Sequence, residues 1–124
     1  MKNFIETIRS EYEVEETILF GFSQGAYLAM QTAVEHPELC QKVVAIGGRI
    51  PDRIYKNKKW QAIALPEILL AVGNQEKPED IKATQAQQRY LKKIDQPVDL
   101  EIYKGPHIVT EDILNIARQW IFKK

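Results

Sequence analysis

The chain lacks several features that define large classes of proteins. Its single cysteine, Cys40, excludes an internal disulfide, which is typical of a reducing compartment. Seventeen basic residues balance seventeen acidic ones, so the net charge favours neither nucleic acid nor an anionic membrane. No run of about eighteen apolar residues occurs, which excludes a membrane-spanning helix. The first residues also lack the apolar stretch of a signal peptide, and we therefore expect a cytoplasmic protein.

Sequence motifs for metals and nucleotides are missing as well. The chain has no metal-ligand cluster, no phosphate-binding loop and no dinucleotide fingerprint, so we expect no cofactor. What is present is a length of 124 residues, which predicts one domain over residues 1–124 with enough chain to bury a core.

Segments with strand and helix patterns alternate along the chain. We expect strands at 17–20, 42–46, 67–72 and 98–103, helices at 2–12, 24–35, 78–95 and from about 110 onward, and an irregular segment at 49–65. This alternation predicts a three-layer α/β fold, with a mainly parallel sheet of about four strands between flanking helices. The first three strands are continuous apolar runs, as strands buried on both faces require, whereas the fourth alternates and is predicted to be an edge.

The most informative segment is Gly-Phe-Ser-Gln-Gly at 21–25, directly after the apolar run 18–20. A Gly-x-Ser-x-Gly pattern between a buried strand and a helix predicts a nucleophile elbow, with Ser23 at a sharp, strained turn. We expect both Gly21 and Gly25 to be needed because larger side chains would collide there. The helix that begins at Gln24 favours negative charge developing near the serine, and the Gln24 amide is a candidate oxyanion donor.

A serine hydroxyl becomes a strong nucleophile only when a histidine accepts its proton. His107 lies in the loop after the fourth strand, at the same end of a parallel sheet as Ser23, and is the candidate general base. His36 lies more than two turns from the elbow, at the end of the helix that carries Ser23. We interpret it as a surface residue.

An acidic side chain must orient the histidine, and two candidates follow the third strand. Glu76 lies three residues after Gly73, at the end of that strand. Asp80 falls in the first turn of the next helix, where the helix dipole alone favours an acid. We favour Glu76 and keep Asp80 as the alternative. The resulting order of serine, acid and histidine is the one found in α/β-hydrolases.

The elbow sequence Gly-Phe-Ser-Gln-Gly-Ala resembles that of the phospholipase/carboxylesterase family, which includes the acyl-protein thioesterases. The likeness continues through His-Pro-Glu at 36–38, the glycine pair at 47–48, Leu-Leu-Ala-Val-Gly at 69–73, Tyr-Lys-Gly at 103–105 and Trp-Ile at 120–121. The resemblance implies a serine hydrolase that acts on small esters or thioesters. It implies Ser23 as nucleophile, His107 as general base and Glu76 as orienting acid.

The chain departs from this family in three respects. Glu76 stands where the family usually has aspartate, and Pro106 precedes His107 where the family commonly has glycine. The chain also matches only the C-terminal half of the family's length. By the resemblance, the missing half carries the loop with a second oxyanion donor. Losing one donor costs on the order of 10²–10³ in rate, so we expect an isolated monomer to be a poor enzyme.

The incomplete sheet also predicts an association. The first strand is expected at an edge, yet it lacks the charge or alternation that blunts natural edges. The last helix is expected to cover one face of the sheet almost alone. We therefore expect a homodimer or association with a separately encoded N-terminal half. The alternative function is a non-catalytic hydrolase remnant that serves as an assembly or binding module.

One further segment is basic and aromatic. Its residues are Arg49, Arg53, Lys56, Lys58 and Lys59, with Tyr55 and Trp60 among them. We interpret it as a solvated loop, with contact to an acidic substrate or headgroup as the alternative.

Overall fold

The computed structural model describes residues 2–11, 16–57 and 64–123. Lys58, Lys59 and Trp60 of the basic segment lie outside the described residues. The strands are β1 (Ile18–Phe22), β2 (Lys42–Ile46), β3 (Glu67–Gly73) and β4 (Val98–Tyr103). The helices are α1 (Lys2–Glu11), α2 (Gln24–Glu35), the 3-10 turn η1 (Pro37–Leu39), α3 (Asp52–Asn57), α4 (Pro78–Lys93) and α5 (Glu111–Phe122).

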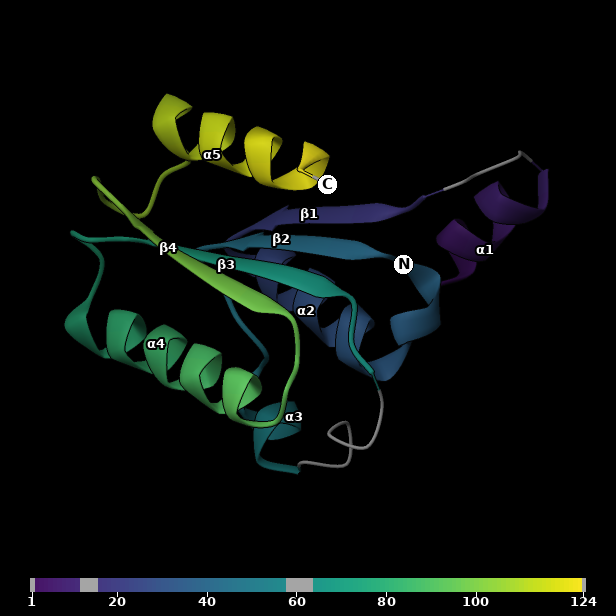
Figure 1. Ribbon diagram of the computed structural model, residues 1–124, viewed down its shortest axis with the longest axis horizontal. Coiled ribbons are helices and arrows are strands. Elements are labelled where there is room, and N and C mark those ends of the chain that lie inside the picture. Colours follow the sequence, from purple (N-terminus) through teal and green to yellow (C-terminus); the bar gives the residue numbers. More distant parts are fainter. Residues whose placement is uncertain (1, 12–15, 58–63, 124) are drawn as a thin grey trace.

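The four strands form one parallel sheet in the order β1-β2-β3-β4. The predicted α/β class and the parallel sheet are therefore confirmed, and β4 lies at an edge as its alternating pattern predicted. Because the strands are parallel, their carboxyl ends meet at one end of the sheet, on the left in Figure 1. The loops after β1, β2, β3 and β4 gather there.

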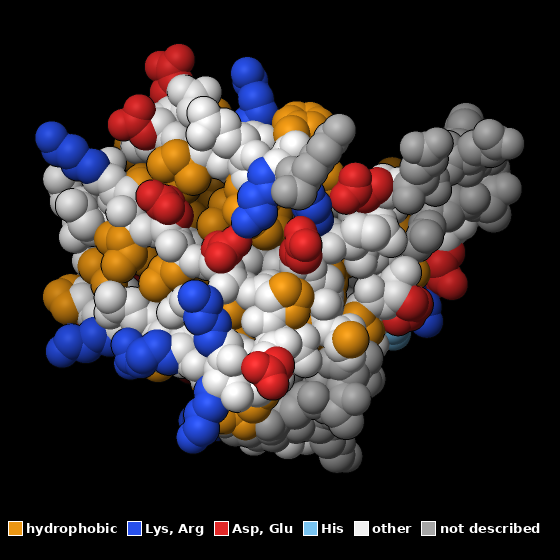
Figure 2. Space-filling view, in the orientation of Figure 1, with side chains coloured by type: hydrophobic (Ala, Val, Ile, Leu, Met, Phe, Trp, Pro, Cys, Tyr) orange, Lys and Arg blue, Asp and Glu red, His pale blue; other side chains and the backbone are white. Residues whose placement is uncertain are grey.

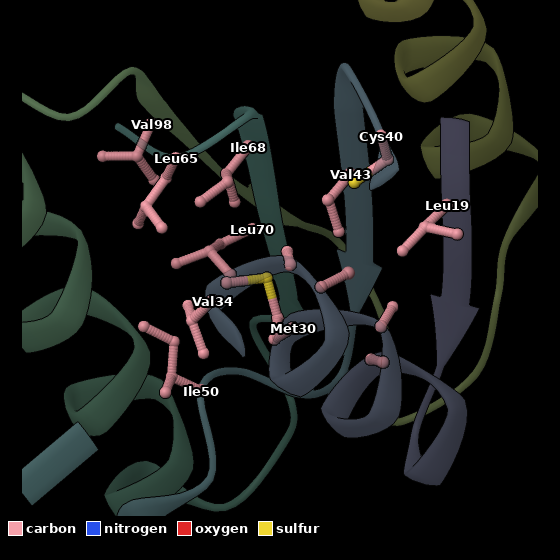
Figure 3. Close-up of a cluster of buried hydrophobic side chains, with 14 of the residues drawn as sticks. Leu19, Met30, Val34, Cys40, Val43, Ile50, Leu65, Ile68, Leu70 and Val98 are labelled. Atoms are coloured by element: carbon pink, nitrogen blue, oxygen red, sulfur yellow. The ribbon is translucent and has the colours of Figure 1, made fainter. Parts of the chain in front are cut away.

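Helices cover both faces of the sheet, which gives the predicted three layers (Figure 1). The helices α2 and α4 lie against one face, and α5 lies against the other. The core on the side of α2 is the larger of the two. Figure 3 labels ten side chains of this cluster, which lies on the side of the sheet covered by α2 and α4: Leu19, Met30, Val34, Cys40, Val43, Ile50, Leu65, Ile68, Leu70 and Val98.

The face under α5 holds a smaller core. Its buried residues are Val44, Ile46, Leu69, Ala71, Tyr103, Ile113, Ala117 and Trp120. The α5 helix is also fixed by polar contacts. Trp120 Nε1 donates a hydrogen bond of 2.7 Å to Asp99 Oδ2 on β4, and Lys42 Nζ donates to the Ile121 carbonyl. Phe20 on β1 points to this face and keeps 46% of its surface exposed, so α5 leaves that edge incompletely covered.

Two details of the helices differ from the sequence-based expectation. The segment predicted to be irregular contains α3, a short helix at 52–57 in which the Pro51 carbonyl accepts hydrogen bonds from Ile54 and Tyr55. Hydrophobic spacing predicts a buried face of α4 formed by Ala83, Ala86, Tyr90, Leu91 and Ile94, but the observed face is more polar. Thr84 and Gln87 are buried beside Leu91, while Ala86 is exposed. Hydrophobic spacing missed this face because two of its buried residues are polar.

Strand β4 carries the acidic residues Asp99 and Glu101, whereas β1 has no charged residue. In Figure 2, acidic and basic side chains are interspersed with hydrophobic ones on the face where β4 is nearest the viewer in Figure 1. Such charges discourage edge-to-edge strand pairing.

Among the described helices, none has the length and apolarity needed to cross a membrane.

Candidate active site

Ser23 occupies the turn between β1 and α2 with φ 58° and ψ −119°, a positive φ that is rare for a residue with a side chain. Its amide donates a 2.9 Å hydrogen bond to the Ile46 carbonyl at the end of β2. The turn is possible because Gly21 has no side chain. A Cβ there would lie 2.3 Å from the Gly25 carbonyl oxygen.

The structure corrects the expectation for the second glycine of the elbow. A Cβ built at Gly25 meets no atom within 4 Å in the described part of the chain. Of the two glycines of the elbow, only Gly21 is therefore required by close packing. No atom of the described residues fills the space beside Gly25.

The structure brings together Ser23, His107 and Glu76, although they lie on three different loops. His107 Nε2 is 3.0 Å from Ser23 Oγ, and His107 Nδ1 is 2.6 Å from Glu76 Oε1. Both distances are hydrogen-bonding distances. The Glu76 side chain is only 5% exposed, and its Oε2 accepts a 2.8 Å hydrogen bond from the Gly73 amide. The carboxylate is thus fixed on one side by backbone and faces the imidazole with its other oxygen.

The His107 ring also lies close to Phe22 and Gly47. The Phe22 ring lies against it with the ring centroids 4.9 Å apart. The backbone of Gly47 is so near the imidazole that an added Cβ would be 2.6 Å from His107 Cε1. Gly47 also has φ 71°, which favours glycine. Sequence reasoning gave neither residue a role, although a glycine pair at the end of a strand was a visible signal for Gly47.

The loop that carries His107 is tied to the loop after β3. Asn74 Oδ1 accepts a 3.0 Å hydrogen bond from the Gly105 amide, and the Gly105 carbonyl accepts one from Gln75. Tyr103 Oη donates a 2.7 Å hydrogen bond to the Ile108 carbonyl beyond the histidine. Burial, followed by the nearby Glu76 charge, raises the pKa of Tyr103, so this phenol stays protonated as a donor. These bonds set the position of His107 relative to Glu76.

The other candidate residues occupy different positions. The Asp80 carboxylate lies 3.4 Å from Arg49 Nη1. His36 ends α2 at the opposite end from Ser23, with its Nδ1 3.8 Å from Glu38.

The candidate oxyanion donor, Gln24, is the first residue of α2, so no carbonyl of that helix accepts a hydrogen bond from its amide. Cys40 is buried in the larger core.

A cavity of about 450 Å³ opens beside Ser23 and His107. Its lining also includes Tyr27, Arg49, Val72, Gln75, Lys77, Asp80 and Thr84, together with Gly47 and Glu76. Within the described residues, no three His, Cys, Asp or Glu side chains are grouped as a metal site would need. The cavity presents a hydrogen-bonded serine, histidine and carboxylate.

A comparison with protein families decides the relationship of this chain. The profile described as Phospholipase/Carboxylesterase matches residues 1–124. The chain belongs to the phospholipase/carboxylesterase family. The resemblance carried by the elbow sequence is therefore confirmed. Known curated proteins gave no significant sequence match.

Several solved structures share this fold. The crystal structure of esterase PE8 superposes with a TM-score of 0.80 at 25% identity, covering 96% of this chain and 56% of that one. SOBER1 from Arabidopsis thaliana gives 0.72 at 21% identity, covering 97% and 60%. FphF, a fluorophosphonate-binding serine hydrolase of Staphylococcus aureus, gives 0.69 at 14%, covering 99% and 62%. The last two show the fold alone.

The chain thus covers between 56% and 62% of these three structures, which is less than two thirds of the length of each. Its four strands and flanking helices correspond to part of an α/β-hydrolase fold.

Proposed function

We propose that this protein is a serine hydrolase of carboxylic esters or thioesters, with Ser23 as nucleophile, His107 as general base and Glu76 as orienting acid. The observation that carries the proposal is the pair of distances at His107, 3.0 Å to Ser23 Oγ and 2.6 Å to Glu76 Oε1. A nucleophile bonded to a base, which is in turn held by a third group, is the arrangement of covalent acyl transfer.

In this mechanism Ser23 Oγ attacks the carbonyl carbon of the ester while its proton passes to His107 Nε2. His107 Nδ1–H donates a hydrogen bond to the Glu76 carboxylate, whose negative charge stabilises the imidazolium. The imidazolium gives its proton to the leaving alcohol or thiol, and an acyl-serine remains. A water deprotonated by His107 attacks the acyl-serine, which releases the acid and restores Ser23.

The tetrahedral intermediates need donors for their oxyanion. The Gln24 amide is one such donor in this proposal, because it begins α2 directly after the nucleophile. A second donor comes from a polypeptide that completes the sheet, beside the open space at Gly25. Without it we expect a rate on the order of 10²–10³ lower.

The rival function is a non-catalytic module that keeps the fold for assembly or binding. The observation that favours it is the coverage of only 56–62% of the related structures. A non-catalytic module has no need for the strained Ser23 backbone or for the buried Glu76 carboxylate facing His107. We therefore prefer the enzyme.

Hydrolysis of 4-nitrophenyl acetate tests the proposal against this rival. We expect slow turnover by the purified chain that falls to the rate of the uncatalysed reaction in Ser23→Ala and drops by orders of magnitude in His107→Ala. Equal rates in the native chain and in Ser23→Ala would favour the non-catalytic module.

A further inference from the structure

Arg49 is a cation in the wall of the candidate active-site cavity. It lies two residues after Gly47, at the end of β2, and lines the same cavity as Ser23 and His107. Its side chain is only 12% exposed. Burying a charged group costs free energy unless the group is paired and hydrogen-bonded. The partners of Arg49 therefore indicate whether the arginine has only a structural role.

The protein gives the Arg49 guanidinium few partners. Among the buried side-chain nitrogens and oxygens of the described residues, Arg49 Nε is the one without a hydrogen-bond partner. Its ion pair with Asp80 measures 3.4 Å, long for a charge-assisted bond, which usually measures about 2.7–2.9 Å. The Tyr27 ring supports the guanidinium, with Arg49 Cζ 5.8 Å from the ring centroid. The Nε donor is therefore left for an incoming acceptor.

The backbone at Arg49 is held by a buried amide. Gln87 on α4 is 2% exposed, and it brackets the next residue, Ile50. Gln87 Oε1 accepts from the Ile50 amide at 3.0 Å, and Gln87 Nε2 donates to the Ile50 carbonyl at 2.8 Å. These two hydrogen bonds hold the backbone next to Arg49 in a fixed position beside the cavity.

The acids of the cavity do not neutralise Arg49 fully. Glu76 is occupied by His107 and the Gly73 amide, and Asp80 makes the long contact described above. Lys77, which is exposed, adds a second positive charge to the lining. We propose that the cavity selects esters or thioesters that carry a carboxylate, and that the Arg49 guanidinium binds this carboxylate. This inference rests on the proposed function for the reaction, although the binding itself is independent of it.

Binding without turnover tests the inference first. The Ser23→Ala chain is titrated with monomethyl succinate, which is an anion, and with dimethyl succinate, its neutral analogue, by NMR. Hydrogen bonds between charged groups are stronger than those of a neutral ester, so we expect the anion to bind roughly tenfold or more tightly. Arg49→Gln in the same background removes this preference, whereas Arg53→Gln, an exposed arginine outside the cavity lining, retains it. Equal binding of both esters, or loss of the preference in both variants, overturns the inference.

Two further variants separate binding from a structural role of the Arg49–Asp80 pair. If the pair served only the fold, Asp80→Asn and Arg49→Gln would act alike. If Arg49 binds the carboxylate, Asp80→Asn removes a competing anion and strengthens binding of monomethyl succinate, opposite to Arg49→Gln. Should Arg49→Gln fail to fold, Arg49→Lys keeps the charge but loses the planar fork, and an intermediate preference is expected.

A second pair of ligands tests whether the bound carboxylate belongs to the acyl part or to the alcohol part of the ester. Acetoxyacetate carries the charge in the alcohol part, whereas monomethyl succinate carries it in the acyl part. Methyl acetoxyacetate serves as the neutral match. A preference that depends on Arg49, in a chain that hydrolyses no ester, would support the anion site while contradicting the proposed function. Hydrolysis of esters with no preference for either anion would support the proposed function and contradict the anion site.

Discussion

Gly47 is the residue on which the position of His107 depends most directly. An alanine Cβ there would lie 2.6 Å from His107 Cε1, so the ring must move away from Ser23. A displacement of about 1 Å can cost on the order of 10²-fold in rate, and we expect Gly47→Ala to lose ester hydrolysis to that extent. The positive φ adds a stability loss of about 1–2 kcal/mol, measurable by urea unfolding.

Gly25→Ala is the matched control for stability. Its Cβ meets no described atom, and alanine is favoured over glycine in a helix by about 1 kcal/mol. We expect its free energy of unfolding to stay the same or to rise slightly. A Gly47→Ala chain that hydrolyses esters at the native rate would show that the ring does not depend on this glycine.

Glu76 and Asp80 are separated by their amide variants. Because Glu76 Oε1 is 2.6 Å from His107 Nδ1, Glu76→Gln should lower the rate of ester hydrolysis by orders of magnitude. Asp80 contacts Arg49 instead, so Asp80→Asn should lower the turnover of a neutral ester by less than about tenfold. The assignment fails if Asp80→Asn is the crippled variant and Glu76→Gln is not.

The sequence allowed the three main site residues to be proposed but not their surroundings. Ser23 lies in a local pattern, and the parallel strands placed His107 and Glu76 at the same end of the sheet. Phe22 and Gly47 act through contacts with His107, which is distant in sequence, so no spacing along the chain indicated these contacts, although the glycine pair at 47–48 was visible. The open space at Gly25 was likewise invisible, because the pattern could not say which glycine is crowded.

At the scale of elements, the regular strands and long helices followed from apolar patterns, whereas α3 and the buried face of α4 did not. The short α3 helix has no buried residue, so no hydrophobic period marked it. On α4, Gln87 is buried because it satisfies both the amide and the carbonyl of Ile50. A polar residue whose burial depends on a distant backbone partner cannot be placed by hydrophobic spacing.

The contact between α5 and β4 predicts a pH dependence of stability. The Trp120 hydrogen bond, aided by Lys123 and opposed by burial, lowers the pKa of Asp99 below its ordinary value of 3.8. A carboxyl group whose pKa is lowered in the folded state stabilises the fold at pH values above its unfolded-state pKa. This stabilisation is lost as the pH falls through the pKa of the folded state. We therefore expect the native chain to be more stable than Asp99→Asn near neutral pH. The difference should shrink below about pH 4 in urea unfolding, and a difference that grows in acid would contradict this contact.

At the scale of the whole molecule, the sheet edge at β1 exposes large apolar side chains. An apolar hollow of about 450 Å³ runs beside it, lined by residues of α1 and of the β1 segment: Phe4, Ile5, Ile8, Thr17, Ile18, Leu19 and Phe20. Half-exposed large side chains on an unblunted edge favour association. We propose that a second copy of the chain covers this edge.

Sedimentation at micromolar concentration tests this association. We expect a dimer that Phe20→Asp converts to a monomer. Ile102→Asp, which changes a similarly exposed residue on the β4 edge, should leave the dimer intact. A stable, compact monomer of the native chain would overturn the proposal. A monomer that instead forms a one-to-one complex with a separate N-terminal half would identify the other occupant.

The central claim is that Ser23 is an activated nucleophile, and labelling by a fluorophosphonate tests it most directly. The chain has only two serines, Ser10 and Ser23, so intact-mass measurement and peptide mapping assign the site without ambiguity. We predict one adduct, located on Ser23, that persists in Ser10→Ala and is abolished in Ser23→Ala. Labelling that survives in Ser23→Ala, or a native chain that does not react under conditions that label other serine hydrolases, would contradict the account.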